Sequence, residues 1–348
     1  MSKRKLTRQQ THRIQRIQDE RIARAGKREA TATAMLESGD LAVEEEGLVM
    51  AHYGTQIDIE ALGGERAGQV FRCHLRANLE HLVTGDRVIW QASLKREEGR
   101  DAIGVVTALQ PRETLLVRPD PYGKLKPVAA NIDRILLVIS PFPEPSALLV
   151  DRYLVACELT GIRPVILLNK ADLITPAMAP LLDALLAQYS AIGYEVRTIS
   201  AGTGQLQDLK DLIGTQTVVF VGQSGVGKSS IINVLLPGAA QKVSAISDAS
   251  RLGQHTTTTA RLFHLPDGGI LIDSPGIREF GLWHVEESDL LAGYIEFAPF
   301  VGTCRFRNCA HRNEPGCALR LAAEEGKINP ARLERFQVLR QNLERPQV

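Results

Sequence analysis

The 348-residue sequence has no long apolar run and only five cysteines, and both shortages limit what the chain can be. No stretch approaches the ~20 consecutive apolar residues that a membrane-spanning helix needs, so we expect no membrane partner. The N-terminus is basic and polar and lacks the apolar stretch of a secretory signal, which indicates a cytoplasmic protein. In that compartment we expect the cysteines to be reduced thiols or metal ligands and not disulfides.

Neither composition nor repetition marks the chain as unusual. Hydrophobic residues make up 44% and charged residues 23% of the sequence, values typical of soluble globular proteins, and no internal repeat is visible. A length of 348 residues exceeds that of one small domain and predicts two or three.

The overall net charge of +1 hides a split between a basic tail and an acidic remainder. Residues 1–28 contain ten lysines and arginines against two acidic residues, a formal charge of +8, which leaves −7 for the rest. Few apolar residues precede Leu41, so we expect residues 1–40 to be a disordered basic tail. Such a tail favours a nucleic-acid partner, because each neutralised phosphate releases counterions; a purely solubilising tail is the alternative.

Short β-rich segments, separated by glycines and charged turns, characterise residues 41–112. They read GLVMAHYG, TQIDIEA, GQVFRCHL, GDRVIWQA and AIGVVTAL. About five short strands in a segment of this size predict a small closed β-barrel, most simply an OB-fold. OB-folds often bind RNA through their strands and loops; a barrel that serves only as a spacer is the alternative.

From Asn131 onward, strands alternate with helices. The apolar run IDRILLVIS is typical of a strand buried on both faces, and the amphipathic LLVDRYLVACELTG that follows ends at Gly161. Further strands read PVILLN, YEVRTIS and TVVFVG, with helices expected near 176–192 and 206–213. This alternation predicts an α/β domain over residues 113–282, with a parallel sheet whose binding loops lie at the carboxyl ends of its strands.

The segment GQSGVGKS lies between an apolar strand and a helical segment and fits the phosphate-loop pattern. Its glycines allow backbone amides to curl around phosphates at a helix N-terminus. Lys228 should reach the β- and γ-phosphates, and Ser229 should ligate Mg²⁺. The residues expected to contact the nucleotide here are Gly222, Gln223, Ser224, Gly225, Val226, Gly227, Lys228, Ser229 and Ser230.

Two further strand ends indicate which base is bound. A carboxylate at Asp172 can accept hydrogen bonds from N1–H and the exocyclic amine of guanine, a donor pair that adenine lacks. Asn169 can bond the base edge and tie neighbouring loops, and the stem of Lys170 can lie over the ring. The tetrapeptide Asn169-Lys170-Ala171-Asp172 is supported by Ser200 and Ala201, where a backbone amide can meet guanine O6. Together these motifs favour GTP over ATP.

Asp273 and Gly276 belong to a DSPG motif that follows the strand GGILI. Asp273 should hold Mg²⁺, and the Gly276 amide can sense the γ-phosphate. Before this motif lies the run Thr256–Thr259. Any of its threonines can complete the Mg²⁺ shell, and Thr258 is favoured; a β-rich edge is the alternative.

The residue that orients the attacking water is not evident from the motifs. Many GTPases use a glutamine directly after the DSPG-type glycine, but this chain has Ile277. We name His255 as the candidate, acting with Lys228 and Thr258, and expect slow intrinsic turnover; the alternatives are a surface role for His255 and a water positioned by a partner.

A cluster of three cysteines and one histidine lies in the C-terminal region, which we assign as a helical domain over residues 283–348 with a final helix near 329–343. Three thiolates and one imidazole make a closed tetrahedral shell, so the spacing predicts one structural Zn²⁺; scattered thiols are the alternative. The expected ligands are Cys304, Cys309, His311 and Cys317.

The motifs occur in a rotated order, with the base motif first, then the phosphate loop, then the DSPG motif. The chain resembles the RsgA family of circularly permuted GTPases over nearly its whole length, in its basic tail, NKAD, GQSGVGKSS, GQHTTT, DSPGIREFGLWH and the Cys/His cluster. The resemblance implies an N-terminal OB-fold, a permuted P-loop GTPase domain and a zinc-bearing helical domain. The family's zinc ligands correspond to the four cluster residues, and its proposed catalytic histidine corresponds to His255.

The resemblance also implies a function. It is GTP hydrolysis during late assembly of the small ribosomal subunit, stimulated by that subunit, with contacts to ribosomal RNA, and we expect a monomer. A translation- or tRNA-related GTPase is the alternative within the same class. An RNA-binding chaperone in which nucleotide only sets conformation is the alternative from another class.

Overall fold

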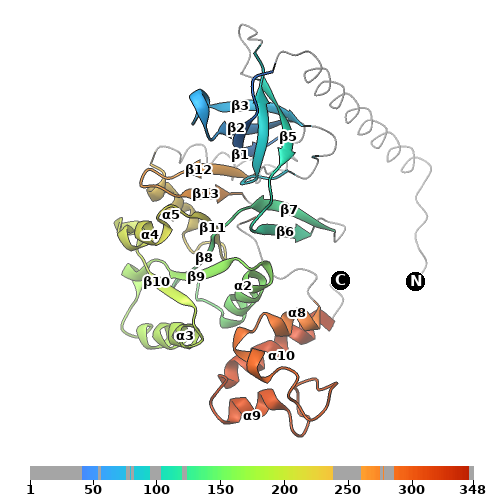
Figure 1. Ribbon diagram of the computed structural model, residues 1–348. Coiled ribbons are helices and arrows are strands. Elements are labelled where there is room, and N and C mark those ends of the chain that lie inside the picture. Colours follow the sequence, from blue (N-terminus) through green and yellow to red (C-terminus); the bar gives the residue numbers. More distant parts are fainter. Residues whose placement is uncertain are drawn as a thin grey trace, which may run out of the picture. The chain divides into compact units, whose positions relative to one another are not determined.

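The computed structural model describes residues 41–53, 56–75, 79, 82–94, 103–119, 124–237, 260–274, 277 and 286–344. The chain forms two compact units that divide between Arg112 and Glu113 (Figure 1). Among the helices in these ranges, none combines the length and apolarity needed to cross a bilayer.

The first unit is a closed five-stranded barrel. The strands follow the order β1-β2-β3-β5-β4, and β4 also pairs with β1, which closes the sheet. Only the β3–β5 pair is parallel. This is the OB-like barrel that the sequence predicts, and its strands are β1 (Glu45–His52), β2 (Gln56–Ala61), β3 (Val70–Leu75), β4 (Arg87–Ala92) and β5 (Ile103–Leu109).

Trp90 fills the centre of the barrel. Its side chain is fully buried and its ring lies 4.7 Å from that of Phe71. A Cβ atom added at Gly47 would lie 2.7 Å from Trp90 Cδ1, and one at Gly104 would lie 2.9 Å from Trp90 Cε3. Two strand glycines therefore make the space that the indole needs, an example of close backbone approach inside a barrel.

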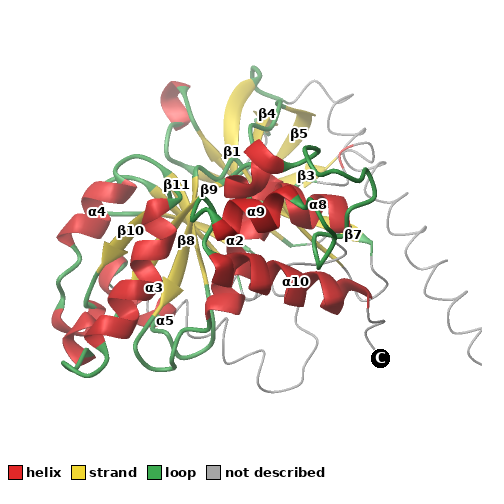
Figure 2. Cartoon of the chain, turned by 90° about the horizontal axis from the view of Figure 1, so that it is seen from below, coloured by secondary structure: helices red, strands yellow, loops and turns green. Residues whose placement is uncertain are grey.

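The second unit is built on a six-stranded sheet in the order β10-β9-β8-β11-β13-β12. All its neighbouring pairs are parallel except β12–β13. Its strands are β8 (Arg134–Ile139), β9 (Arg163–Leu168), β10 (Glu195–Thr198), β11 (Thr217–Val221), β12 (Arg261–His264) and β13 (Ile270–Asp273). Its helices are α2 (Ala147–Thr160), α3 (Ala179–Ala191), α4 (Gln207–Ile213) and α5 (Lys228–Leu235). Figure 2 shows helices on both sides of this sheet.

The central strand β8 is buried on both faces, as its continuous apolar run predicts. Leu136 belongs to the same core cluster as Leu209 of α4 and Ile231 of α5. Its neighbours Ile135 and Leu137 are also buried and, because side chains alternate along a strand, face the other side. Helix α2 packs on β8 and β9 and ends at Gly161, whose φ of 70° gives the left-handed C-cap.

One hairpin was not anticipated from the sequence. Strands β6 (Leu115–Pro119) and β7 (Leu125–Ala130) pair antiparallel as a separate two-stranded sheet. Pro119 and Pro127 interrupt the apolar alternation in these segments, and proline weakens a strand prediction because it lacks an amide donor. Only the paired geometry reveals this element.

The C-terminal residues form a helical cluster. Tyr294 stacks on Phe297 at 4.9 Å, and Phe336 packs edge-on against both rings. The predicted final helix is present, with Phe336 fully buried and Leu343 38% exposed near its C-terminal end. The elements are α8 (Glu287–Ala292), η5 (Ile295–Phe300), α9 (Ala318–Glu324) and α10 (Pro330–Glu344).

Candidate functional site

The carboxyl ends of the parallel strands meet at one edge of the sheet. Val221 of β11 is level with Leu137 of β8, and Ile139 of β8 is level with Leu168 of β9. Leu168 in turn pairs with Thr198 of β10. The loops that follow these strands therefore lie side by side, which is where open α/β sheets bind ligands.

Lys228 lies inside the curve of the loop between β11 and α5. Its ammonium group donates to the carbonyl oxygens of Gly222 at 2.5 Å and Gln223 at 2.8 Å. The side chain is buried, whereas Ser224 and Ser229 are exposed. The strand–loop–helix frame places a cation beside a glycine-rich loop at the N-terminus of α5, the arrangement that suits phosphate.

Two glycines of this loop are required by close contacts and by backbone geometry. Gly222 has a φ of 137°, and a Cβ atom there would lie 2.3 Å from the Val138 carbonyl oxygen. Gly227 has a φ of 97°, and its Cβ atom would lie 2.4 Å from Asn169 Nδ2. Because side chains avoid both this φ range and these distances, the loop can approach β8 and β9 only with glycine at the two positions.

Asn169 ties together three loops. It directly follows β9 and is 1% exposed. Its Nδ2 donates to the Val226 carbonyl oxygen at 3.0 Å, and its Oδ1 accepts from the Ala201 amide at 3.1 Å. The sequence predicts that Asn169 ties neighbouring loops, and these two bonds do so. It also indicates the Ala201 amide as a donor to guanine O6, whereas here that amide donates to Asn169.

Lys170 reaches across to the phosphate loop. Its Nζ donates to the Gly225 carbonyl oxygen at 2.6 Å and to the Phe142 carbonyl oxygen at 2.7 Å. The buried Ser140 hydroxyl donates to the same Phe142 oxygen at 2.7 Å. Sequence reasoning missed Ser140 and Phe142, although their position at the carboxyl end of a buried parallel strand is a usable signal.

Asp172 is held by its backbone and leaves its carboxylate to solvent. Its amide donates to the buried Ser200 Oγ at 3.0 Å, and the Ala171 amide donates to the Ile199 carbonyl oxygen at 3.2 Å. The Asp172 side chain is exposed and, within the described part of the chain, its carboxylate makes no hydrogen bond or ion pair. A carboxylate on a fixed backbone at the strand edge can accept two parallel donors from a ligand.

Asp273 ends β13, the strand next to β11, and its side chain is buried near the phosphate-loop edge. Ile277 is 1% exposed, so its side chain belongs to the core and cannot orient a water. His255, Thr258 and Gly276, the other residues named for catalysis or γ-phosphate sensing, lie outside the described residues.

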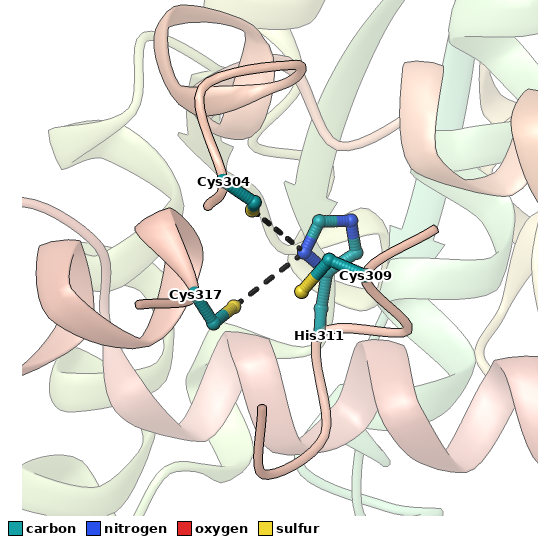
Figure 3. A group of neighbouring side chains, drawn as sticks. All are labelled: Cys304, Cys309, His311 and Cys317. Atoms are coloured by element: carbon teal, nitrogen blue, oxygen red, sulfur yellow. Dashed lines mark hydrogen bonds between the residues drawn. The ribbon is translucent and has the colours of Figure 1, made fainter. Parts of the chain in front are cut away.

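A second cluster lies in the C-terminal helices. The ligand atoms of Cys304, Cys309, His311 and Cys317 all lie within 4.8 Å of one another (Figure 3). His311 Nδ1 is 3.5 Å from both Cys304 Sγ and Cys317 Sγ. A tetrahedral ion with ordinary zinc–ligand bonds separates its ligand atoms by roughly 3.5–4 Å, so the four side chains fit one metal ion.

The loops of this cluster are fixed by hydrogen bonds to residues that are not expected ligands. Glu314 accepts from the amides of Ala310 and Arg312 at 3.0 and 2.8 Å, and Gln337 of α10 donates to the His311 carbonyl oxygen at 2.5 Å. Burial, followed by the charge of Arg340, lowers the pKa of His311. A neutral imidazole is the form that binds a metal.

The other two cysteines are core residues. Cys73 and Cys157 are both 0% exposed, and burial raises the pKa of each thiol. Thiols of this kind are protonated and unreactive, and both cysteines are free, as expected from the sequence for thiols that bind no metal.

Comparison with known proteins places the chain in a family. The model of the RsgA GTPase family matches residues 109–283. The small ribosomal subunit biogenesis GTPase RsgA of Azotobacter vinelandii is 56% identical over the full length of both chains. That of Pseudomonas fluorescens is 57% identical over 97% of this chain and 96% of the relative.

Two solved structures share the fold. YjeQ from Thermotoga maritima superposes with a TM-score of 0.69 at 29% identity, covering 86% of this chain and 99% of the other. YloQ, described as a circularly permuted GTPase, superposes with a TM-score of 0.67 at 27% identity, covering 88% and 98%. With a barrel of OB-like order, a permuted α/β domain and a cluster of three cysteines and a histidine able to hold a metal ion, the chain belongs to the RsgA GTPase family.

Proposed function

We propose that this chain is a GTP hydrolase that acts in biogenesis of the small ribosomal subunit, and that its nucleotide site is the strand edge described above. The observation that carries the proposal is the bond network of Asn169 and Lys170, which closes the loop after β9 onto the phosphate loop. A phosphate-binding loop and a base-binding loop held at this distance form one site for one nucleotide.

In this proposal each loop binds a different part of GTP. Backbone amides between Gly222 and Gly227 hold the phosphates, and Lys228 exchanges its carbonyl partners for phosphate oxygens. The carboxylate of Asp172 accepts from the guanine edge, with Ser200 fixing its backbone. A site that depends on these donors rejects adenine, because adenine would leave the carboxylate unpaired.

The same proposal assigns two metal ions. Mg²⁺ would be bound with GTP by the Ser229 hydroxyl and, through water, by Asp273, where it would neutralise charge that develops on the phosphates. Zn²⁺ would be held by the four-residue cluster, because three thiolates with one imidazole form a closed shell that zinc favours. With no open ligand position, that ion stabilises the fold and does not catalyse.

Ribosomal RNA is the proposed macromolecular partner, in the cytoplasm, bound by a monomer of this chain. Arg305, Arg307 and Arg312 are exposed and lie in the sequence between the first and last cluster ligands, and the tail of residues 1–28 carries a formal charge of +8. Segregated positive charge of this kind binds phosphate backbones. The named relatives are small-subunit biogenesis factors, which makes that subunit the first partner to test.

The test is a GTP hydrolysis assay with and without purified small ribosomal subunits, with ATP as competitor. We expect slow intrinsic turnover, a clear increase with small subunits and no inhibition by ATP. Stimulation by large subunits or by tRNA alone would contradict the assignment to small-subunit biogenesis. Retained assembly function in a Lys228→Ala variant would show that hydrolysis is incidental.

A further inference from the structure

Two arginines of α10 bind one carboxylate of α2. Arg332 Nη1 lies 2.7 Å from Asp151 Oδ1, and Arg335 Nε lies 2.6 Å from Asp151 Oδ2. The side chains of Asp151 and Arg332 are 0% and 1% exposed. Tyr189 of α3 donates its hydroxyl to Asp151 Oδ1 at 2.6 Å. Asp151 is thus the point at which α2, α3 and α10 are joined.

Glu296 of η5 holds the other side of Arg332. The guanidinium donates to both Glu296 carboxylate oxygens, at 2.6 and 3.0 Å, and lies 4.4 Å from the centre of the Tyr294 ring. The group is balanced in charge, with two arginines and two carboxylates. Buried ion pairs are seldom better for stability than apolar residues of similar size, and their best-attested role is to fix registration. The group's distinctive contribution is therefore one defined placement of α10 on α2.

A second contact fixes the same face of α2. A Cβ atom added at Gly293, which follows α8, would lie 2.4 Å from Val155 Cγ1. Val155 and Asp151 are four residues apart on α2 and so share one face of the helix. The C-terminal helices therefore contact α2 at two successive turns. One contact is the ion pairs of Asp151, and the other is the close approach of the Gly293 backbone to Val155.

The N-terminal end of α2, close to Asp151, leads to the nucleotide site. Ser146 caps the helix by accepting from the Leu149 amide at 3.4 Å, and the preceding loop contains Phe142, whose carbonyl oxygen accepts from Lys170. A small cavity is lined by Pro143 of the loop before α2, by Tyr153 of α2 itself and by Gln223 of the phosphate loop. Movement of α2 therefore reaches both the base-binding and the phosphate-binding loops.

We infer that Asp151, Arg332 and Arg335 are positioning residues that couple the C-terminal helices to the nucleotide site through α2. The inference rests on the proposed function, since it concerns regulation of the same site. Displacement of α10, as on contact with a partner, shifts α2 and loosens its hold on the nucleotide loops. Because coupling is reciprocal, bound nucleotide must also tighten α10.

Arg335→Gln is the principal test, because Arg335 lies at the rim of the group, 16% exposed, where its loss disturbs folding least. Binding of a fluorescent GDP analogue and hydrogen exchange of residues 330–344, with and without GDP, are measured in the full-length chain. We expect affinity to fall at least about fivefold, the lower end of ordinary coupling, and GDP-dependent protection of α10 to disappear. Arg335→Lys should recover part of both effects.

Arg320→Gln is the matched control, because Arg320 lies on α9 of the same helical cluster, is 40% exposed and bonds to two exposed side chains, Asn313 at 3.2 Å and Glu324 at 4.0 Å. It should leave both readouts unchanged. If Arg335→Gln does not fold, Tyr189→Phe, which removes one bond to Asp151, replaces it with the same expected effects. A folded variant with wild-type affinity and wild-type GDP-dependent protection overturns the inference alone. A wild-type chain that binds no guanine nucleotide overturns the proposed function as well.

Discussion

The side-chain amide of Asn169 donates to the Val226 carbonyl oxygen at 3.0 Å, across 57 residues of chain. This bond, with the one from the Ala201 amide at 3.1 Å, joins the loop after β9 to the loop between β11 and α5, the two loops that we propose bind one nucleotide. It also explains why the rotated order of motifs is tolerated. The loops are brought together because β9 and β11 both pair in parallel with β8, and not by their succession along the chain.

Asn169→Ala should impair both stability and nucleotide binding. It leaves the Val226 carbonyl and the Ala201 amide without their partner in a buried setting, which costs about 1–3 kcal/mol of unfolding free energy. Denaturant unfolding measures the first effect and nucleotide titration the second. Asp172→Ala is the control, because that exposed side chain should affect binding and leave stability nearly unchanged. Equal stability of the two variants would contradict a stabilising role for the Asn169 bonds to Val226 and Ala201.

Asp172→Asn should change which base is preferred. An asparagine cannot accept from both guanine donors but can donate to a 2-oxo group, so binding should shift from guanosine toward xanthosine nucleotides. Competition between GDP and XDP for the two proteins measures the ratio. A variant that weakens both ligands equally would mean that this carboxylate does not face the base.

Gly222→Ala should destabilise the protein, because the added Cβ atom would lie 2.3 Å from the Val138 carbonyl oxygen at a φ of 137°. Overpacking of this kind typically costs about 1–3 kcal/mol. Gly202→Ala is its matched control, since nothing lies within 4 Å of a Cβ atom there. Thermal unfolding should separate the two variants, and similar melting temperatures would contradict the close approach of the loop to β8.

Metal binding at the Cys/His cluster should release protons and strengthen as pH rises. Burial, as the largest cause, raises the pKa of Cys309 to about 12, so without metal that thiol is protonated at neutral pH and must lose its proton to become a ligand. His311, whose pKa is lowered, is already neutral there and releases none. Zn²⁺ competition against a chelator at pH 6 and pH 8 should give the tighter binding at pH 8. A pH-independent affinity, or no affinity, would contradict the zinc assignment.

The sequence predicted those parts of the fold that depend on local pattern. The apolar run of β8 and the glycine that ends α2 indicated their elements directly, and the phosphate loop was recognisable from its spacing. The β6–β7 hairpin was missed because Pro119 and Pro127 mask its alternation. The Asp151–Arg332 pair could not be predicted, since it joins residues 181 apart and nothing local in either helix signals its partner.

Equilibrium titration of the full-length chain with guanosine and adenosine nucleotides, in Mg²⁺, tests the central claim most directly. A base pocket that depends on Asp172 predicts binding of GDP and GTP with at least about 100-fold weaker binding of ADP and ATP, because unpaired polar groups penalise the wrong base. Equal affinity for both purines, or binding of neither, would contradict the assignment of these two loops to one guanine-nucleotide site.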